Sequence, residues 1–266
     1  MKSILSIILM LIVASANIRT DAQNSASELV TSANAAYEKD DFNQAIKLYE
    51  EAAAADGTSS ELYYNMGNTY YRLGNMGKAI LYYERSLMLD PSNDDARTNL
   101  DFVNDKIQLK VDRGTTFFSD TIGGFVKRTS SNTWGWAGVI CFLLFIGAIL
   151  IYIFMDAVVL RKIGFFGGGI LLILSILANV CAFYTHASAV NHDYAIVTVP
   201  SVTLSTSPRI PKDKSEEAFL LNEGTKVEIV DSLTNTSQSG MKDTWLDVKA
   251  DEQHRAWVNA RNVEKI

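Results

Sequence analysis

The chain has 266 residues, a formal net charge of −6 and a sequence pI ≈ 5.1. This acidic balance leaves no basic stripe to neutralise phosphates, which argues against a nucleic-acid partner. The length allows one or two soluble domains. The two cysteines, Cys141 and Cys181, both fall in long apolar runs, so the soluble parts have no disulfide framework.

The first residues predict a signal peptide. Lys2 precedes an apolar run from Ile4 to Val13, and small residues follow as far as Ala16. This pattern is typical of secretory signals, and we expect one over residues 1–22, with cleavage after Ala16 or Ala22. A retained anchor is the weaker interpretation because the run is shorter than the ~20 residues that span a bilayer.

Two segments then repeat with a period of 34 residues. Small residues pair with small residues, tyrosine with tyrosine and aspartate with aspartate: Ala33 with Gly67, Ala45 with Ala79, Ile46 with Ile80, Tyr49 with Tyr83, and Asp56 with Asp90. Small side chains let two helices approach closely, and the tyrosines fill the remaining space. The period therefore predicts a repeated helix–turn–helix unit.

This pattern resembles the tetratricopeptide repeat (TPR). Gly74 suits the turn between two helices, and Pro91 follows the second copy. The first copy departs from the pattern, with Asp40 at the turn glycine and Gly57 in place of proline. A further amphipathic segment, Asp94 to about Lys110, reads as a capping helix. We expect two repeats and a cap over residues 26–110, an array short of the usual three units.

Two apolar runs predict a transmembrane hairpin over residues 134–185. Trp134 to Met155 and Ile163 to Thr185 carry no charge, and both are long enough to cross a bilayer. Lysine and arginine flank the first run at both ends, so charge alone leaves the orientation open. The signal peptide places the connection in the cytoplasm and both soluble regions outside it. Residues 111–133 read as a flexible linker or a short interfacial helix.

Small residues in these runs suit close helix contact. Gly164 and Gly168 form a small-xxx-small pair, a pattern that is also common by chance in glycine-rich spans. Cys141 and Cys181 are interpreted as small apolar packing residues.

Residues 194–266 change to short β-branched and aromatic runs separated by polar turns, which predicts a small antiparallel barrel. The runs "YAIVTV", "VTLSTSP", "EGTKVEIVDS", "TWLDVKA" and "HRAWVNARNVEKI" resemble a bacterial SH3 domain. Ala256 replaces the family's usual glycine, and Ser205 its usual arginine. Trp245 and Trp257 are candidates for a ligand groove, although core packing is the favoured interpretation of Trp245.

No catalytic constellation is recognisable. His186, His192 and His254 have no cysteine or carboxylate at metal-ligand spacing. The run "GFFGGG" lies in an apolar span rather than after a strand, so it is not a phosphate-binding loop. We expect no enzymatic activity, no metal and no cofactor.

The repeats instead predict a peptide-binding surface. In the TPR family, the first helix of each repeat lines a concave groove. The resemblance assigns this face six partner-binding residues: Asn34, Tyr37, Tyr64, Asn68, Tyr71 and Arg72. Asparagine and arginine suit the backbone and any carboxylate of an extended peptide. Tyr37 and Tyr71 are equally well explained by packing between repeats.

The full order of parts resembles the BatE-type proteins of the Bacteroides aerotolerance operons. The fold class is then multidomain: all-α TPR helical repeats, two transmembrane helices and a C-terminal all-β SH3-like barrel. The resemblance implies an inner-membrane protein with periplasmic domains. It also implies partners with von Willebrand factor A domains and a MoxR-type AAA+ ATPase.

The function expected from the sequence is a non-enzymatic scaffold whose groove holds a partner segment at the membrane surface. The alternative is peptidoglycan sensing or tethering through the SH3-like domain, which rests on fold analogy. Transport is disfavoured because neither span contains an ionisable residue.

Overall fold

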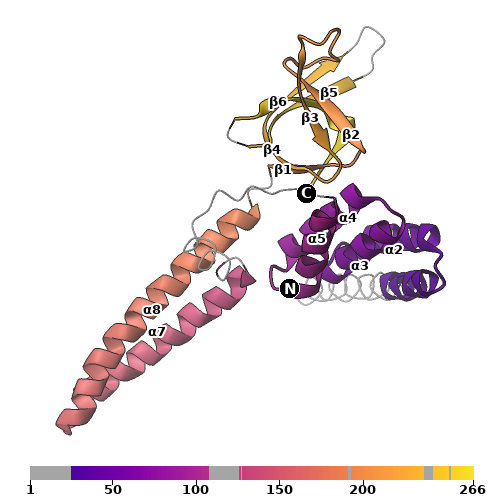
Figure 1. Ribbon diagram of the computed structural model, residues 1–266. Helices are drawn as coiled ribbons and strands as arrows, with labels where there is room; N and C mark the ends of the chain where they lie inside the picture. Colours follow the sequence, from indigo (N-terminus) through magenta and orange to yellow (C-terminus); the bar gives the residue numbers. More distant parts are fainter. Residues whose placement is uncertain (1–24, 108–125, 127, 191–192, 237–241, 252) are drawn as a thin grey trace, which may run out of the picture. The chain divides into compact units, whose positions relative to one another are not determined.

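The computed structural model describes residues 25–107, 126, 128–190, 193–236, 242–251 and 253–266 (Figure 1). These residues form two units, which are described separately. One contains the helical repeats and the C-terminal sheet, and the other contains a helical hairpin. The predicted signal peptide and most of the predicted linker lie outside the described residues.

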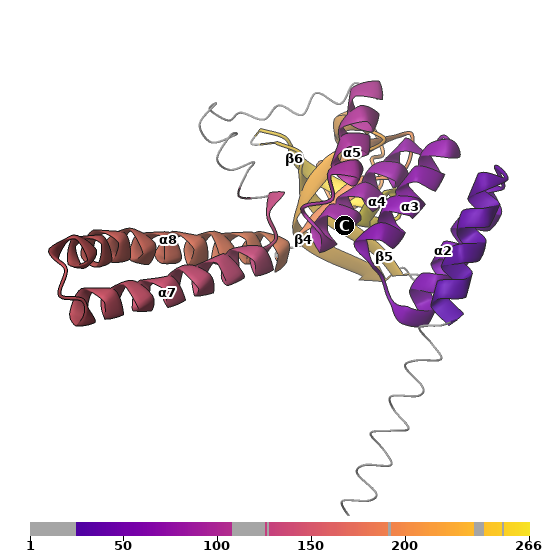
Figure 2. The same ribbon diagram turned by 90° about the horizontal axis from the view of Figure 1, so that it is seen from below.

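The repeat region is helical, as predicted. Residues 25–38 are helical, and four helices follow: α2 (Phe42–Asp56), α3 (Ser60–Arg72), α4 (Met76–Leu89) and α5 (Asp94–Lys106). Figure 2 shows α2 to α5 side by side in chain order. The helix over residues 25–38 and α2 form the first repeat, α3 and α4 form the second, and α5 is the capping helix.

Polar side chains define where these helices begin. Asp41 accepts a hydrogen bond from the backbone N–H of Gln44, and Ser59 accepts one from Leu62. Asn93 caps α5 in the same way. Each bond satisfies one of the backbone donors that a helix leaves unpaired at its N-terminus.

The turn inside each repeat needs a left-handed residue. Gly74 has φ 79°, and Asp40, which lies 34 positions earlier, has φ 59°. Aspartate tolerates this conformation better than most residues with a Cβ. The first repeat therefore keeps the turn geometry without the glycine.

Close helix contact explains the small residues of the period. A Cβ on Gly67 would lie 2.7 Å from two ring carbons of Tyr83, so only glycine leaves that ring in place. Ala33, Ala45 and Ala79 are fully buried. The tyrosine of each repeat fills the space beside these small residues, as the period predicted.

The C-terminal residues form one antiparallel sheet. Its strands are β1 (Tyr194–Val197), β2 (Ser201–Ser205), β3 (Glu217–Asn222), β4 (Lys226–Thr236), β5 (Lys242–Lys249), β6 (Arg255–Asn259) and β7 (Val263–Lys265), with a 3-10 turn at Ala260–Asn262. The strand order is β3-β2-β6-β5-β4-β1-β7. Figure 1 shows the sheet strongly curled.

Two features of the sheet correct the prediction. The expected barrel is not closed in the part of the chain that the structure describes, because β3 and β7 end the sheet and do not pair with each other. Strand β3 is not among the predicted strands, because only Leu221 of its six residues is buried and its sequence therefore shows no clear alternation. The antiparallel arrangement itself is confirmed.

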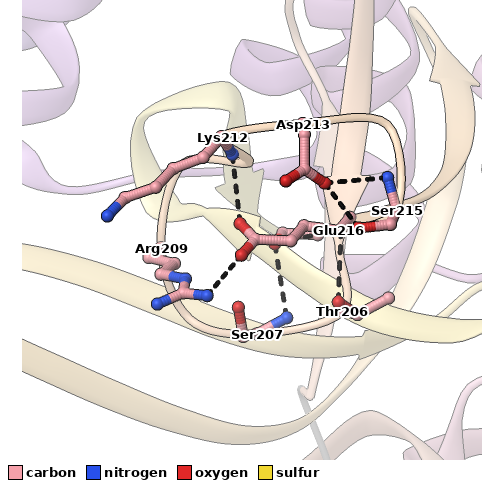
Figure 3. A network of polar contacts seen from close by, with 8 residues as sticks. Thr206, Ser207, Arg209, Lys212, Asp213, Ser215 and Glu216 are labelled. Atoms are coloured by element: carbon pink, nitrogen blue, oxygen red, sulfur yellow. Dashed lines mark hydrogen bonds and ion pairs between the residues drawn. The ribbon is translucent and has the colours of Figure 1, made fainter.

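The long connection between β2 and β3 is held by its own polar contacts (Figure 3). The carboxylate of Glu216 accepts hydrogen bonds from the Arg209 guanidinium and from the backbone N–H of Lys212. Hydrogen bonds from Ser215 hold the pKa of Asp213 below its usual value. These carboxylates are already occupied by residues of the same loop, so they are poor candidates for ligand binding.

Strand β1 is buried on both faces. Ala195 and Val197 lie in the core of the sheet, whereas Ile196 packs into the core of the repeats. Successive side chains of a strand point to opposite faces, so β1 joins two hydrophobic cores. The continuous apolar run at this strand follows from that double burial.

Helix α4 carries the contact with the sheet. The Glu223 carboxylate accepts a 2.7 Å hydrogen bond from the backbone N–H of Gly77, in the first turn of α4, where negative charge is favoured. Lys226 pairs with Glu84 at 2.9 Å, and Arg85 pairs with Glu264 at 3.0 Å. The sheet thus packs on the helix that completes the second repeat.

The second unit is a pair of helices, α7 (Ser131–Phe154) and α8 (Val158–Val190), which lie side by side in both ribbon views (Figures 1 and 2). By length and composition both are apolar enough to cross a membrane, with mean hydropathy of 2.8 and 2.2. This is weak support for the expected spans, because buried helices of soluble proteins also meet these criteria.

Small residues make the contact between α7 and α8. A Cβ on Gly164 would lie 2.7 Å from the carbonyl oxygen of Ala148, and one on Gly168 would lie 3.3 Å from the Ala148 Cβ. Ser175 donates a 2.9 Å hydrogen bond to the carbonyl of Gly138. The small-xxx-small pair therefore packs the two helices of this hairpin together.

Candidate functional site: a groove in the helical repeats

A groove of about 330 Å³ opens on the repeats. Its lining is mostly aromatic, with two asparagines and one arginine: Tyr37, Tyr64, Asn68, Tyr71, Arg72, Tyr83, Asn99, Phe102 and Val103. Helices α3, α4 and α5 contribute most of these residues. Five of the six predicted partner-binding residues therefore lie around one groove, although whether they bind a partner stays a prediction.

Asn68 has its amide oxygen occupied from two sides. Its Oδ1 accepts a hydrogen bond from the Tyr83 hydroxyl at 2.7 Å and another from Asn99 Nδ2 at 2.8 Å. These bonds fix the amide orientation, so the Nδ2 donors cannot exchange places with the oxygen. Among the described residues, Asn68 Nδ2 has no hydrogen-bond partner.

Burial keeps the tyrosine hydroxyls protonated. It raises the pKa of Tyr83 above its usual value, and it raises the pKa of Tyr49 to about 12, with a smaller contribution from Tyr37. A protonated hydroxyl donates its hydrogen bond to asparagine at any physiological pH.

Arg72 is already engaged at the rim of the groove. Its guanidinium forms a 2.6 Å ion pair with Asp40, the left-handed residue of the first repeat. It also lies 4.5 Å from the ring centroid of Phe42. Arg72 therefore links the two repeats, and a partner carboxylate would have to compete with Asp40 for it.

Tyr71 and Phe102 form a further part of the lining. Their rings meet edge to face at 5.9 Å, and Phe102 is 57% exposed. Lys106 donates a 3.1 Å hydrogen bond to the Tyr71 hydroxyl. A partner's apolar side chain can pack on the exposed ring of Phe102.

Asn34 does not line this groove. It accepts a 2.6 Å hydrogen bond from Tyr49, which is the first-repeat counterpart of the bond from Tyr83 to Asn68. Four lining residues were not predicted: Tyr83, Asn99, Phe102 and Val103. Phe102 lies 34 positions after Asn68. Extending the 34-residue period into the capping helix would therefore have identified it.

The tryptophans of the sheet differ in exposure. Trp245 is buried, at 6% exposed, and its Nε1 donates a hydrogen bond to Asp243 at 3.1 Å. Its burial agrees with the packing interpretation. Trp257, which is opposite Ser205 and Asp247 in the register, is partly exposed.

Comparisons with known proteins identify the repeats. Residues 60–93 match the family model described as tetratricopeptide repeat, and residues 33–74 match one described as TPR repeat. Protein SGT1 homolog of Oryza sativa subsp. japonica is 37% identical over 71 residues, which are 27% of this chain and 19% of that protein. The chain thus spans a small part of this relative.

A solved structure gives a weaker likeness. The Sgt2 TPR domain from Aspergillus fumigatus is 23% identical, with a TM-score of 0.30, and the match covers 31% of this chain and 55% of that one. The family matches confirm the predicted TPR repeats, which are modules of protein interaction.

Proposed function

We propose that the chain is a non-enzymatic scaffold whose TPR groove binds an extended segment of a protein partner. The groove carries the proposal, because the amide donors of Asn68 in it have no partner among the described residues. Main-chain carbonyls of an extended peptide are the natural acceptors for such donors. The TPR matches support a role in protein interaction.

The proposal includes a membrane anchor. Helices α7 and α8 would cross the bacterial inner membrane as a hairpin, with the repeats and the sheet in the periplasm. Support comes from two long apolar helices joined by small residues and from the order of parts along the chain. That order also supports a BatE-type aerotolerance complex, with von Willebrand A-domain proteins and a MoxR-type AAA+ ATPase as partners and with an SH3-like C-terminal module.

Co-purification from cross-linked native membranes tests the groove. Phe102→Asp places a charge on the exposed groove wall, so we expect it to remove the captured proteins. Leu89→Asp introduces the same charge at an exposed leucine of α4 outside the groove. We expect this variant to capture the same proteins as the native chain. Identical captured proteins from both variants and from the native chain would show that the groove does not recruit them.

Cysteine labelling tests the anchor. With Cys141 and Cys181 replaced by serine, Asp156→Cys should react with a membrane-impermeant reagent only after the inner membrane is opened. Lys214→Cys, in the loop before β3, should react as soon as the outer membrane is permeabilised. Equal accessibility of both sites would contradict the hairpin.

A further inference from the structure

Asn68 and two tyrosines offer free hydrogen-bond donors to the groove. Asn68 Nδ2 carries two N–H groups without a partner in the described part of the chain. The hydroxyls of Tyr37 and Tyr64 likewise make no hydrogen bond to any described residue. The two Asn68 N–H groups call for an acceptor on the ligand, and the tyrosine hydroxyls can also donate to one.

The two cations beside the groove, Arg72 and Lys106, already contact groups of the same chain. Arg72 is paired with Asp40 at 2.6 Å, and its guanidinium lies 4.5 Å from the ring centroid of Phe42. Lys106 remains at the rim, beside the Tyr71 hydroxyl. An acidic segment would have to compete with Asp40 for Arg72.

The aromatic lining of the groove suits flat, rigid side chains of a ligand. Tyr37, Tyr64, Tyr71, Tyr83 and Phe102 line a groove of about 330 Å³. Aromatic grooves bind polyproline II segments, in which proline rings pack on aromatic faces at little entropic cost. Such a segment also exposes unpaired carbonyls, and its prolines have no N–H to satisfy.

We infer that the groove selects an uncharged, proline-rich segment in the polyproline II conformation. This inference rests on the proposed function, and it adds the chemistry of the partner. The proline rings pack against the accessible aromatic residues Tyr37, Tyr64, Tyr71 and Phe102, and Asn68 Nδ2 donates to a carbonyl of the segment. The ion pair between Arg72 and Asp40 remains formed when the segment is bound.

Fluorescence anisotropy with the full-length chain in detergent tests the inference. The labelled probes are a peptide of repeated Pro-Pro-Ala units, a peptide of equal length made of Gly-Ser units, and one that ends in glutamates and a free carboxylate. Asn68→Asp keeps the oxygen that accepts from Tyr83 and Asn99 but removes both donors. Asn75→Asp makes the same change at the cap of α4, where aspartate serves equally well.

We expect the Pro-Pro-Ala peptide to bind at least about tenfold more tightly than the other two. Asn68→Asp should weaken it about tenfold, and Asn75→Asp should leave it unchanged. Tighter binding of the acidic peptide, weakened by Arg72→Gln, would overturn the inference while keeping the scaffold.

Absence of binding by all three peptides would also overturn the inference. The co-purification with Phe102→Asp then decides separately whether the groove recruits a partner.

Discussion

The hydroxyl of Tyr83 donates a 2.7 Å hydrogen bond to Asn68, and 34 residues earlier Tyr49 makes the same bond to Asn34 at 2.6 Å. The two bonds tie the second helix of each repeat to the first. They serve packing in the first repeat, whereas in the second the asparagine also faces the groove.

Removing either hydroxyl should weaken the fold modestly. Tyr49→Phe removes the hydrogen bond that the Tyr49 hydroxyl donates to Asn34 Oδ1, and we expect a loss of about 1 kcal/mol in the free energy of unfolding. Tyr83→Phe should cost no more, because Asn68 keeps the bond from Asn99. Tyr37→Phe serves as the control. Urea denaturation measures all three, and a Tyr83→Phe cost well above that of Tyr49→Phe would contradict the account.

Alkaline pH should destabilise the repeats. Burial raises the pKa of Tyr49 from 10.0 to about 12, so the folded state holds this proton more tightly than the unfolded state. Its contribution is complete below pH 10 and is lost as the pH rises towards 12. Unfolding followed from pH 9 to pH 12 should be less pH-dependent in Tyr49→Phe than in the native chain. Equal slopes would show that Tyr49 is not the group responsible.

The positive φ of Asp40 predicts that alanine, glycine and asparagine at this position differ in their effect on stability. Asp40→Ala should cost about 1–2 kcal/mol, because alanine is strained at φ 59°. Asp40→Gly removes that strain and should cost only the exposed ion pair with Arg72. Asp40→Asn keeps the tolerance of the left-handed region and loses only the exposed ion pair with Arg72, worth roughly 0–1 kcal/mol. Thermal unfolding measures the series, and an alanine variant as stable as the glycine variant would refute the strain.

The contact between α4 and the sheet predicts coupling between Glu84 and Lys226. Their side chains are 22% and 41% exposed, so the 2.9 Å pair should contribute only about 0.2–1 kcal/mol and weaken with salt. A double-mutant cycle with Glu84→Gln and Lys226→Gln measures it. Glu61→Gln, at an exposed residue of α3, should combine additively with Lys226→Gln. Additivity in the Glu84 cycle as well would mean that this pair contributes nothing in solution.

Local patterns predicted the helical repeats well. The 34-residue period places small residues against tyrosine, and each repeat forms its own close contact, so the signal repeats along the chain. The turn at Asp40 was recognised as a departure, and its left-handed φ shows how the chain accommodates it. Strand β3 could not be predicted, because this edge strand buries too few side chains to show an alternation of apolar and polar residues.

Two TPR repeats, a pair of long apolar helices and an antiparallel C-terminal sheet could be predicted from the sequence alone, because each follows from a repeat, an apolar run or an alternation among neighbouring residues. The tertiary structure decided that Arg72 pairs with Asp40 and that Ile196 packs into the core of the repeats. It also decided that Glu223 meets the first turn of α4. These contacts join segments far apart in the chain, and their partners are selected by geometry that no local pattern records.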